Sequence, residues 1–168
     1  MQLALVISGE LALSRSDDGC SPSTSLVGAV QSLLSPHEVA EPTDGETSSA
    51  VHGVLAAYAI VALGKFSLGS SELAKRLAPV FLHELMASEV CAVRNNALVV
   101  LFDLAKAHTA ILERHFGAIA LALYDASPVV RHQATLVCTR RHPLSSYPLS
   151  SRSWRALPSA SLKERGAL

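Results

Sequence analysis

The sequence predicts an all-α fold, a stack of paired antiparallel helices of the α-α superhelix, or solenoid, type. Apolar residues make up 49% of the 168 residues, and they recur along the chain at the spacing of a helix face. No stretch alternates apolar and polar residues with the period of two that a strand requires. Breaks of a few residues separate the helical stretches of the second half, and such short breaks force neighbouring helices to run antiparallel.

The first 35 residues predict two N-terminal helices of this stack. Residues 3–14 have an amphipathic pattern, a run of turn formers follows, and residues 25–34 carry leucines and valines at helical spacing. Residues 36–49 contain two prolines, a glycine and four acidic residues, a composition that buries little apolar surface. We therefore expect an acidic, flexible loop over residues 36–49.

The regular part of the chain covers residues 50–140. Ser70 or Ser71 can cap one helix, and Ser127 before Pro128 combines a helix cap with proline at the first helical position. The five helices expected are 50–68, 71–87, 90–107, 109–124 and 127–140. Residues 141–168 are rich in serine, proline and arginine, and we expect a disordered tail there.

The helices of this part repeat with a period of about 38 residues. The pair Val93-Arg94 recurs as Val130-Arg131, 37 residues later. The segment "AIVALGKF" at 59–66 matches "ALVVLFDL" at 97–104, 38 residues later. In a solenoid the middle helices touch their own partner and the repeats on both sides. A helix in that position is apolar nearly all round.

The 90–107 helix fits this position. A narrow polar stripe along it contains Asn96, Asp103 and Lys106, and Leu98, Leu101 and Leu104 lie away from that stripe. A helix with so much apolar surface is expected to have neighbours on three sides.

The turn "DASPVVRHQA" resembles the HEAT repeat, an ARM-type helical repeat. In that family an acid in the turn between helices and an arginine early in the next helix form a ladder between neighbouring repeats. The resemblance assigns Asp125, Arg94 and Arg131 to this ladder. The preceding repeat has Ala87-Ser88 where the acid is expected, so the predicted ladder is incomplete.

Over residues 1–138 the chain resembles a more specific family, the HEAT-rich non-SMC D-type subunits of condensin. It is most similar to the condensin II version, the D-three subunits. The residues that carry the resemblance are Leu63-Gly64-Lys65, Leu73-Ala74-Lys75, Val93-Arg94-Asn95-Asn96, Phe102-Asp103-Leu104, and Asp125 with Val130-Arg131.

This resemblance implies a scaffold of the nucleus and the chromosome that acts in mitotic chromosome condensation. The implied partners are the kleisin and SMC subunits of condensin II, with non-specific contacts to chromatin DNA as a further expectation. The family has no catalytic site of its own, since ATP hydrolysis belongs to the SMC partners. The chain is far shorter than such subunits, so we expect a solenoid fragment.

A polar edge on the 90–107 helix and its neighbour is the candidate partner-binding surface. Arginine forks suit carboxylate and phosphate groups, and amides can contact a peptide. The alternative is that these side chains make helix caps and hydrogen bonds between repeats. The candidate residues are Arg94, Asn95, Asn96, Asp103, Lys106 and Arg131.

The sequence gives no sign of a catalytic, cofactor or metal site. The three cysteines, Cys20, Cys91 and Cys138, form no CxxC pair, and an odd count argues against a disulfide framework. His83-Glu84 resembles the metal pair of the HEAT-like diiron hydroxylases, an alternative of a different class. That reading needs several converging ligands, yet the equivalent pair one repeat later is Leu121-Ala122.

Charge is unevenly distributed along the chain. Residues 1–50 have one arginine and seven acids, whereas residues 51–168 have thirteen lysines and arginines and seven acids. The asymmetry fits either a nucleic-acid or acidic partner, or an acidic loop and a basic tail in solvent. No apolar run reaches the roughly 18 residues needed to span a bilayer, so no membrane is expected. A small-molecule substrate is not expected either.

Overall fold

The computed structural model describes residues 1–16, 22–35 and 45–140. Over these residues the secondary structure is helical, without strands, which confirms the predicted all-α class. The helices are α1 (Gln2–Ser16), α2 (Thr24–Ser32), α3 (Gly45–Leu68), α4 (Ser71–Ala87), α5 (Cys91–Ala107), α6 (Thr109–Leu112), α7 (Phe116–Ala120) and α8 (Pro128–Arg140), with the 3-10 turns η1 (Glu113–His115) and η2 (Leu121–Tyr124). The expected tail, 141–168, lies outside the described residues.

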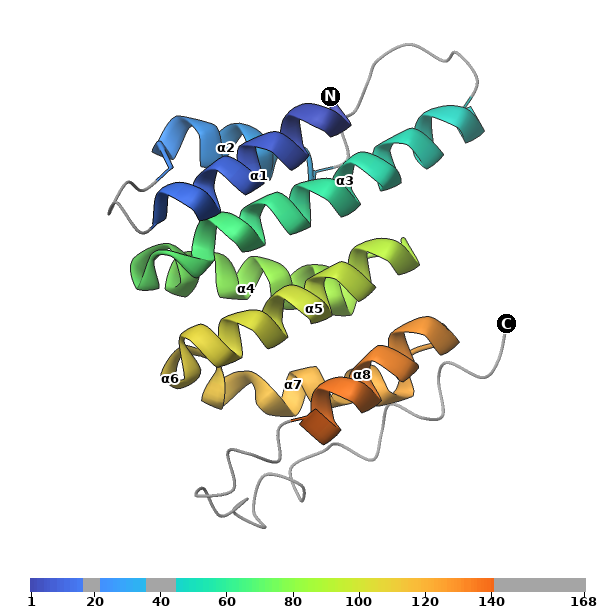
Figure 1. Cartoon of the computed structure of the whole chain (residues 1–168). Helices are drawn as coiled ribbons and strands as arrows, with labels where there is room; N and C mark the ends of the chain where they lie inside the picture. Colours follow the sequence, from blue (N-terminus) through green and yellow to red (C-terminus); the bar gives the residue numbers. More distant parts are fainter. Residues whose placement is uncertain (17–21, 36–44, 141–168) are drawn as a thin grey trace.

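The helices are stacked in two layers (Figure 1). In one layer α1, α3, α5 and α8 lie side by side, each in contact with the next. In the other layer α4 contacts α6 and α7 directly. The two segments that the repeat makes equivalent, 71–87 and 109–124, are therefore neighbours, as a helical-repeat stack requires.

One helix begins several residues before the expected position. The helix expected from residue 50 begins at Gly45, so residues 45–49 of the expected loop are helical, while 36–44 lie outside the described residues. Once a helix is nucleated, each further turn costs little, so the apolar stretch after residue 50 carries the helix back into polar sequence. By contrast α4 has the expected bounds, and the Ser70 hydroxyl accepts a hydrogen bond from the Leu73 N–H.

The single helix expected over 109–124 is wrong. The structure divides this segment into α6, η1, α7 and η2. Glycine costs about 1 kcal/mol relative to alanine inside a helix, and Gly117 stands in the middle of the segment. Gly117 thus weakens a continuous helix, and the short pieces α6 and α7 both contact α4.

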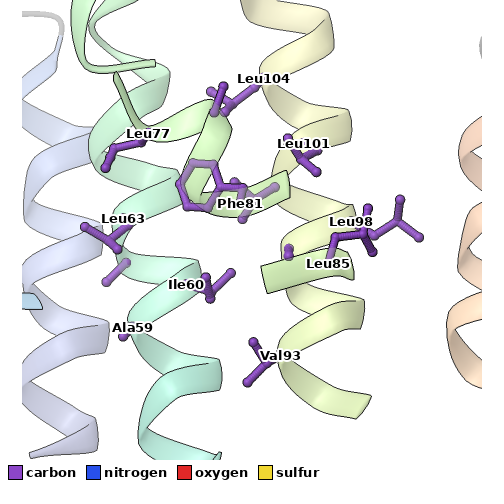
Figure 2. Packing of buried hydrophobic residues seen from close by; sticks show 14 of the residues in the cluster. Ala59, Ile60, Leu63, Leu77, Phe81, Leu85, Val93, Leu98, Leu101 and Leu104 are labelled. Atoms are coloured by element: carbon purple, nitrogen blue, oxygen red, sulfur yellow. The ribbon is translucent and has the colours of Figure 1, made fainter. Parts of the chain in front are cut away.

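Buried side chains repeat with the period read from the sequence. Ile60, Leu63 and Phe66 of α3 are buried, and so are the α5 residues 38 positions later, Leu98, Leu101 and Leu104. Phe81 of α4 is fully buried and lies between the buried leucines of α3 and α5 (Figure 2). Equivalent positions of the two repeats thus contribute side chains to one continuous core.

Helix α3 corrects the expectation about membrane-length runs. Ala50–Leu68 is a 19-residue stretch with mean hydropathy 1.6, long and apolar enough to cross a bilayer by length and composition. Of the window, 56% is buried, and α3 is in contact with α1, α4 and α5. The central helix of a stack reaches this apolar content because it has neighbours on several sides.

Gly64 lets α3 and α5 approach closely, so we predict that Gly64→Ala destabilises the protein. An added Cβ would lie 2.5 Å from Val100 Cγ2 and 2.8 Å from Cγ1. Overpacking of this kind costs about 1–3 kcal/mol, and Val100 is β-branched and cannot turn away easily. Urea unfolding measures the loss in free energy of unfolding.

Gly117→Ala is the matched control for this prediction. A Cβ at Gly117 meets nothing within 4 Å, so the substitution should be neutral or stabilising by about 0.5–1 kcal/mol. Adding Val100→Ala to Gly64→Ala should recover part of the loss. Equal effects of the two glycine substitutions would contradict close contact between α3 and α5.

Candidate interaction surface

The sequence-predicted residues Arg94 and Asp125 meet across two repeats. Arg94, in the first turn of α5, donates from Nε to Asp125 Oδ2 at 2.8 Å and from Nη2 to Oδ1 at 2.9 Å. Both side chains are largely buried, with 13% and 11% of their surface exposed. Two parallel charge-assisted bonds fix geometry as well as adding energy, so this pair sets the position of the turn before α8 against α5.

Arg94 and Arg131 make the same contacts in successive repeats. Arg94 Nη1 donates to the carbonyl oxygens of Ser88 and Glu89, six and five residues earlier. Arg131 Nη1 donates to the carbonyl oxygens six and five residues before it, those of Asp125 and Ala126. Each arginine thus ties down the turn before its own helix. Only Arg94, of the two, also has a carboxylate partner among the described residues.

The ion pair shifts the pKa of both partners. The hydrogen bond from Arg94 lowers the pKa of Asp125, the Ser127 N–H and the Arg131 charge lower it further, and burial opposes them. The hydrogen bond to Asp125 raises the pKa of Arg94 above its ordinary value. Arg94 therefore stays charged at any pH of interest, and the pair titrates through Asp125.

This pKa shift predicts a loss of stability in acid. Because Asp125 is more acidic in the folded state, it stabilises the fold above its unfolded pKa of about 3.9 and loses that contribution as the pH falls through the lower folded value. Between pH 5 and pH 2.5 the wild type should lose more free energy of unfolding than Asp125→Asn. Urea unfolding across this range measures both, and parallel curves would refute the linkage.

The two asparagines of the candidate surface have different environments. Asn96 Nδ2 donates to the Ala57 carbonyl oxygen of α3 at 3.0 Å, a hydrogen bond between repeats of the kind that the alternative reading expects. Its amide oxygen is an additional acceptor. Asn95 is half-buried, and no side-chain hydrogen bond of Asn95 is found within the described part of the chain.

Asp103 and Lys106 lie on the outward face of α5. Lys106 Nζ donates to Asp103 Oδ1 at 3.1 Å and lies 4.2 Å from the centroid of the Phe102 ring. Both side chains are well exposed, at 45% and 61%. An exposed pair of this kind contributes little to stability. Because both side chains are exposed, both charged groups are accessible to a partner.

A shallow groove of about 110 Å³ runs between α3 and α5 beside these residues. Gly64 and Val100, which lie against each other where the two helices approach, both line it. Its floor is mostly apolar and its rim is polar. The residues that line it are Val61, Gly64, Lys65, Leu68, Asn96, Val99, Val100 and Asp103.

Sequence reasoning picked out only two of the residues lining this groove as candidates, Asn96 and Asp103. It missed Val61, Leu68 and Val99, which looked like core residues because helical spacing does not separate a buried face from a groove wall. A possible signal was Gly64, since a glycine inside an apolar helix often marks close backbone approach.

The candidate metal pair has no further ligands in the described residues. His83 Nδ1 lies 3.4 Å from Glu84 Oε1 on the same helix, and His83 is 72% exposed. Across residues 1–16, 22–35 and 45–140, no group of three or more His, Cys, Asp and Glu side chains is placed to hold a metal ion.

Comparisons with known proteins find similarity to three condensin II subunits. The chain is 36% identical over 99 residues to condensin-2 complex subunit D3 of Mus musculus, which is 59% of this chain and 7% of that protein. It is 30% identical over 101 residues to subunit D3-L of Xenopus laevis, 60% of this chain and 7% of that protein. It is 36% identical over 78 residues to subunit CAP-D3 of Arabidopsis thaliana, 46% of this chain and 6% of that protein.

These similarities confirm the resemblance to the D-type subunits of condensin II. No family model matches the chain, and no solved structure matches it. The match spans less than a tenth of the length of each of the three relatives.

Proposed function

We propose that this chain acts as a HEAT-repeat scaffold segment of a condensin II D-type subunit. The observation that carries the proposal is the 36% identity over 99 residues to subunit D3 of Mus musculus. The contacts of Arg94 support it, because its carbonyl contacts recur at Arg131 and its ion pair with Asp125 joins successive helix pairs in a stack that can present an extended surface. The proposed work of the chain is binding and positioning, without catalysis.

The proposed partner-binding surface is the groove between α3 and α5 with the exposed side chains beside it. Its apolar floor can take an aliphatic side chain, and the Asn96 amide oxygen can accept a backbone N–H from an extended peptide. Asp103 and Lys106 add a charge of each sign at the rim. We propose a segment of the kleisin subunit as the occupant, with the SMC subunits held through it.

Arg94 and Arg131 have a different role in this proposal. Arg94 is occupied by Asp125 and two carbonyl oxygens, so it maintains the stack and does not itself contact the partner. Arg131 is exposed and donates to two carbonyls, which leaves further N–H donors. Contact of Arg131 with chromatin DNA would be non-specific and salt-dependent. The proposed location is the nucleus and the chromosome, in mitotic chromosome condensation.

Co-purification tests the proposal. The chain is co-expressed with the kleisin and the two SMC subunits of condensin II, and retention on a tag carried by the kleisin is measured. We expect wild type to be retained and Val99→Glu to be lost, because a charge on the groove wall is incompatible with an apolar occupant. His83→Glu places the same side chain at an exposed position of α4 and should be retained.

The outcomes separate the alternatives. Failure of the wild type to be retained would leave the chain as another HEAT scaffold, of the transport or phosphatase type. Equal retention of Val99→Glu and His83→Glu would remove the groove from the proposal and leave the family role. Iron analysis of the purified chain addresses the diiron hydroxylase, which requires at least one iron per chain.

A further inference from the structure

The turn before α8 carries a serine that the proposed function does not use. Ser127 lies between η2 and α8 and is followed by Pro128, the first residue of α8. Ser127 itself is half-buried, but the residues around it are exposed: Tyr124 at 71% and Val129 at 58%, together with Ala126 and Pro128. A Ser-Pro pair in an exposed turn is the minimal sequence that proline-directed protein kinases recognise.

Within the described part of the chain, the hydroxyl of Ser127 has a single partner, a thiol. Ser127 Oγ lies 3.0 Å from Cys91 Sγ at the start of α5, and thiols are weak donors and acceptors. The backbone N–H of Ser127 donates to Asp125 Oδ1 at 2.7 Å, and its carbonyl oxygen accepts from the Arg131 N–H at 3.1 Å. The hydroxyl is thus not needed to hold the turn together.

Two guanidinium groups lie around this serine. Asp125 Oδ1 accepts a hydrogen bond from the Ser127 N–H at 2.7 Å and another from Arg94 Nη2 at 2.9 Å. Arg94 and the backbone of Ser127 therefore share one acceptor oxygen. Arg131 Nη1 donates to the carbonyl oxygens of Asp125 and Ala126 in the same turn. A phosphate on Ser127 would find both groups within reach, in addition to the first N–H groups of the 13-residue helix α8.

We propose that Ser127 is a phosphorylation site of a proline-directed kinase, and that the phosphate replaces Asp125 as the ion-pair partner of Arg94. In the reaction the Ser127 oxygen attacks the γ-phosphorus of ATP and its proton passes to the kinase. A new oxygen–phosphorus bond forms, the bond between the β–γ bridging oxygen and the γ-phosphorus breaks, and ADP leaves. The inference is independent of the proposed function.

The charges give the direction of the change. A phosphoserine carries close to two negative charges at neutral pH, and Asp125 lies against the same turn. The like charges repel, and the phosphate offers Arg94 more acceptor oxygens than the carboxylate does. The phosphate also takes space where Ser127 now meets Cys91, so the junction between α5 and α8 opens and the half-buried Cys91 thiol becomes more accessible.

The experiment uses the full chain with an active mitogen-activated protein kinase and ATP. The chain has two other Ser-Pro pairs, at Ser21 and Ser35, so the background is Ser21→Ala with Ser35→Ala. Mass spectrometry should find phosphate on Ser127 in this protein and none when Ser127→Ala is added. Absence of phosphate on Ser127 in the folded chain overturns the assignment of the site.

Alkylation of Cys91 tests the consequence. The rate of Cys91 modification by iodoacetamide, resolved by mass spectrometry, should rise several-fold after phosphorylation. Ser127→Glu should also raise it relative to Ser127→Ala, without any kinase, and circular dichroism checks that both variants are folded. Unchanged alkylation in the phosphorylated chain overturns the displacement of Arg94.

Discussion

Replacing Phe81 with alanine will lower the free energy of unfolding by about 3–5 kcal/mol, the usual cost of removing a buried aromatic side chain. Phe81 is fully buried and is the one aromatic side chain that α4 contributes to the core between α3 and α5. Its removal leaves a cavity that the neighbouring leucines cannot fill without moving whole helices. Since domains are stable by about 5–15 kcal/mol, this loss is a large share of the total.

The control for this prediction lies two residues further along the same helix. His83 is 72% exposed, and His83→Ala should change the free energy of unfolding by no more than about 0.5 kcal/mol. Phe81→Leu keeps most of the volume and should cost less than Phe81→Ala. Urea unfolding at neutral pH measures all three variants. A loss below about 1 kcal/mol for Phe81→Ala would contradict a core shared by the three helices.

The sequence predicted the stack because its signals are local and repeated. A capping serine before α4 and short breaks between helices gave bounds that the structure reproduces for Ser71–Ala87. The period of 38 residues identified equivalent buried positions in α3 and α5 correctly. The segment 109–124 was predicted less well, because the spacing of apolar residues does not show where a weak helix breaks into short pieces.

The candidate surface was predictable only in part. The resemblance to the HEAT repeat assigned Arg94 and Asp125 to one ladder, and in the structure the two side chains are in contact although they are 31 residues apart. The groove was missed because periodicity tells which positions are equivalent but not how closely two helices approach. The closest approach found at a glycine of α3 is at Gly64, which lies against Val100.

Breaking the Arg94–Asp125 pair will also destabilise the protein strongly. Hydrogen bonds to charged groups contribute about 1.5–3 kcal/mol, and removing either partner leaves the other charge largely buried. We expect Arg94→Ala to cost more than Asp125→Ala, because Arg94 also loses its bonds to the Ser88 and Glu89 carbonyls. Arg94→Lys should recover little, since lysine lacks the planar fork that meets both carboxylate oxygens.

A double-mutant cycle isolates the ion pair from these other contacts. The double variant should cost less than the sum of the two single variants by about 1–3 kcal/mol. Arg131→Ala is the matched comparison, because Arg131 makes the same two carbonyl contacts in the next repeat and has no carboxylate partner among the described residues. Its cost therefore measures what the carbonyl contacts contribute alone. If Arg94→Ala and Arg131→Ala cost the same, and the cycle shows additivity, the pair does not join the repeats, and the regular stack depends on apolar packing alone.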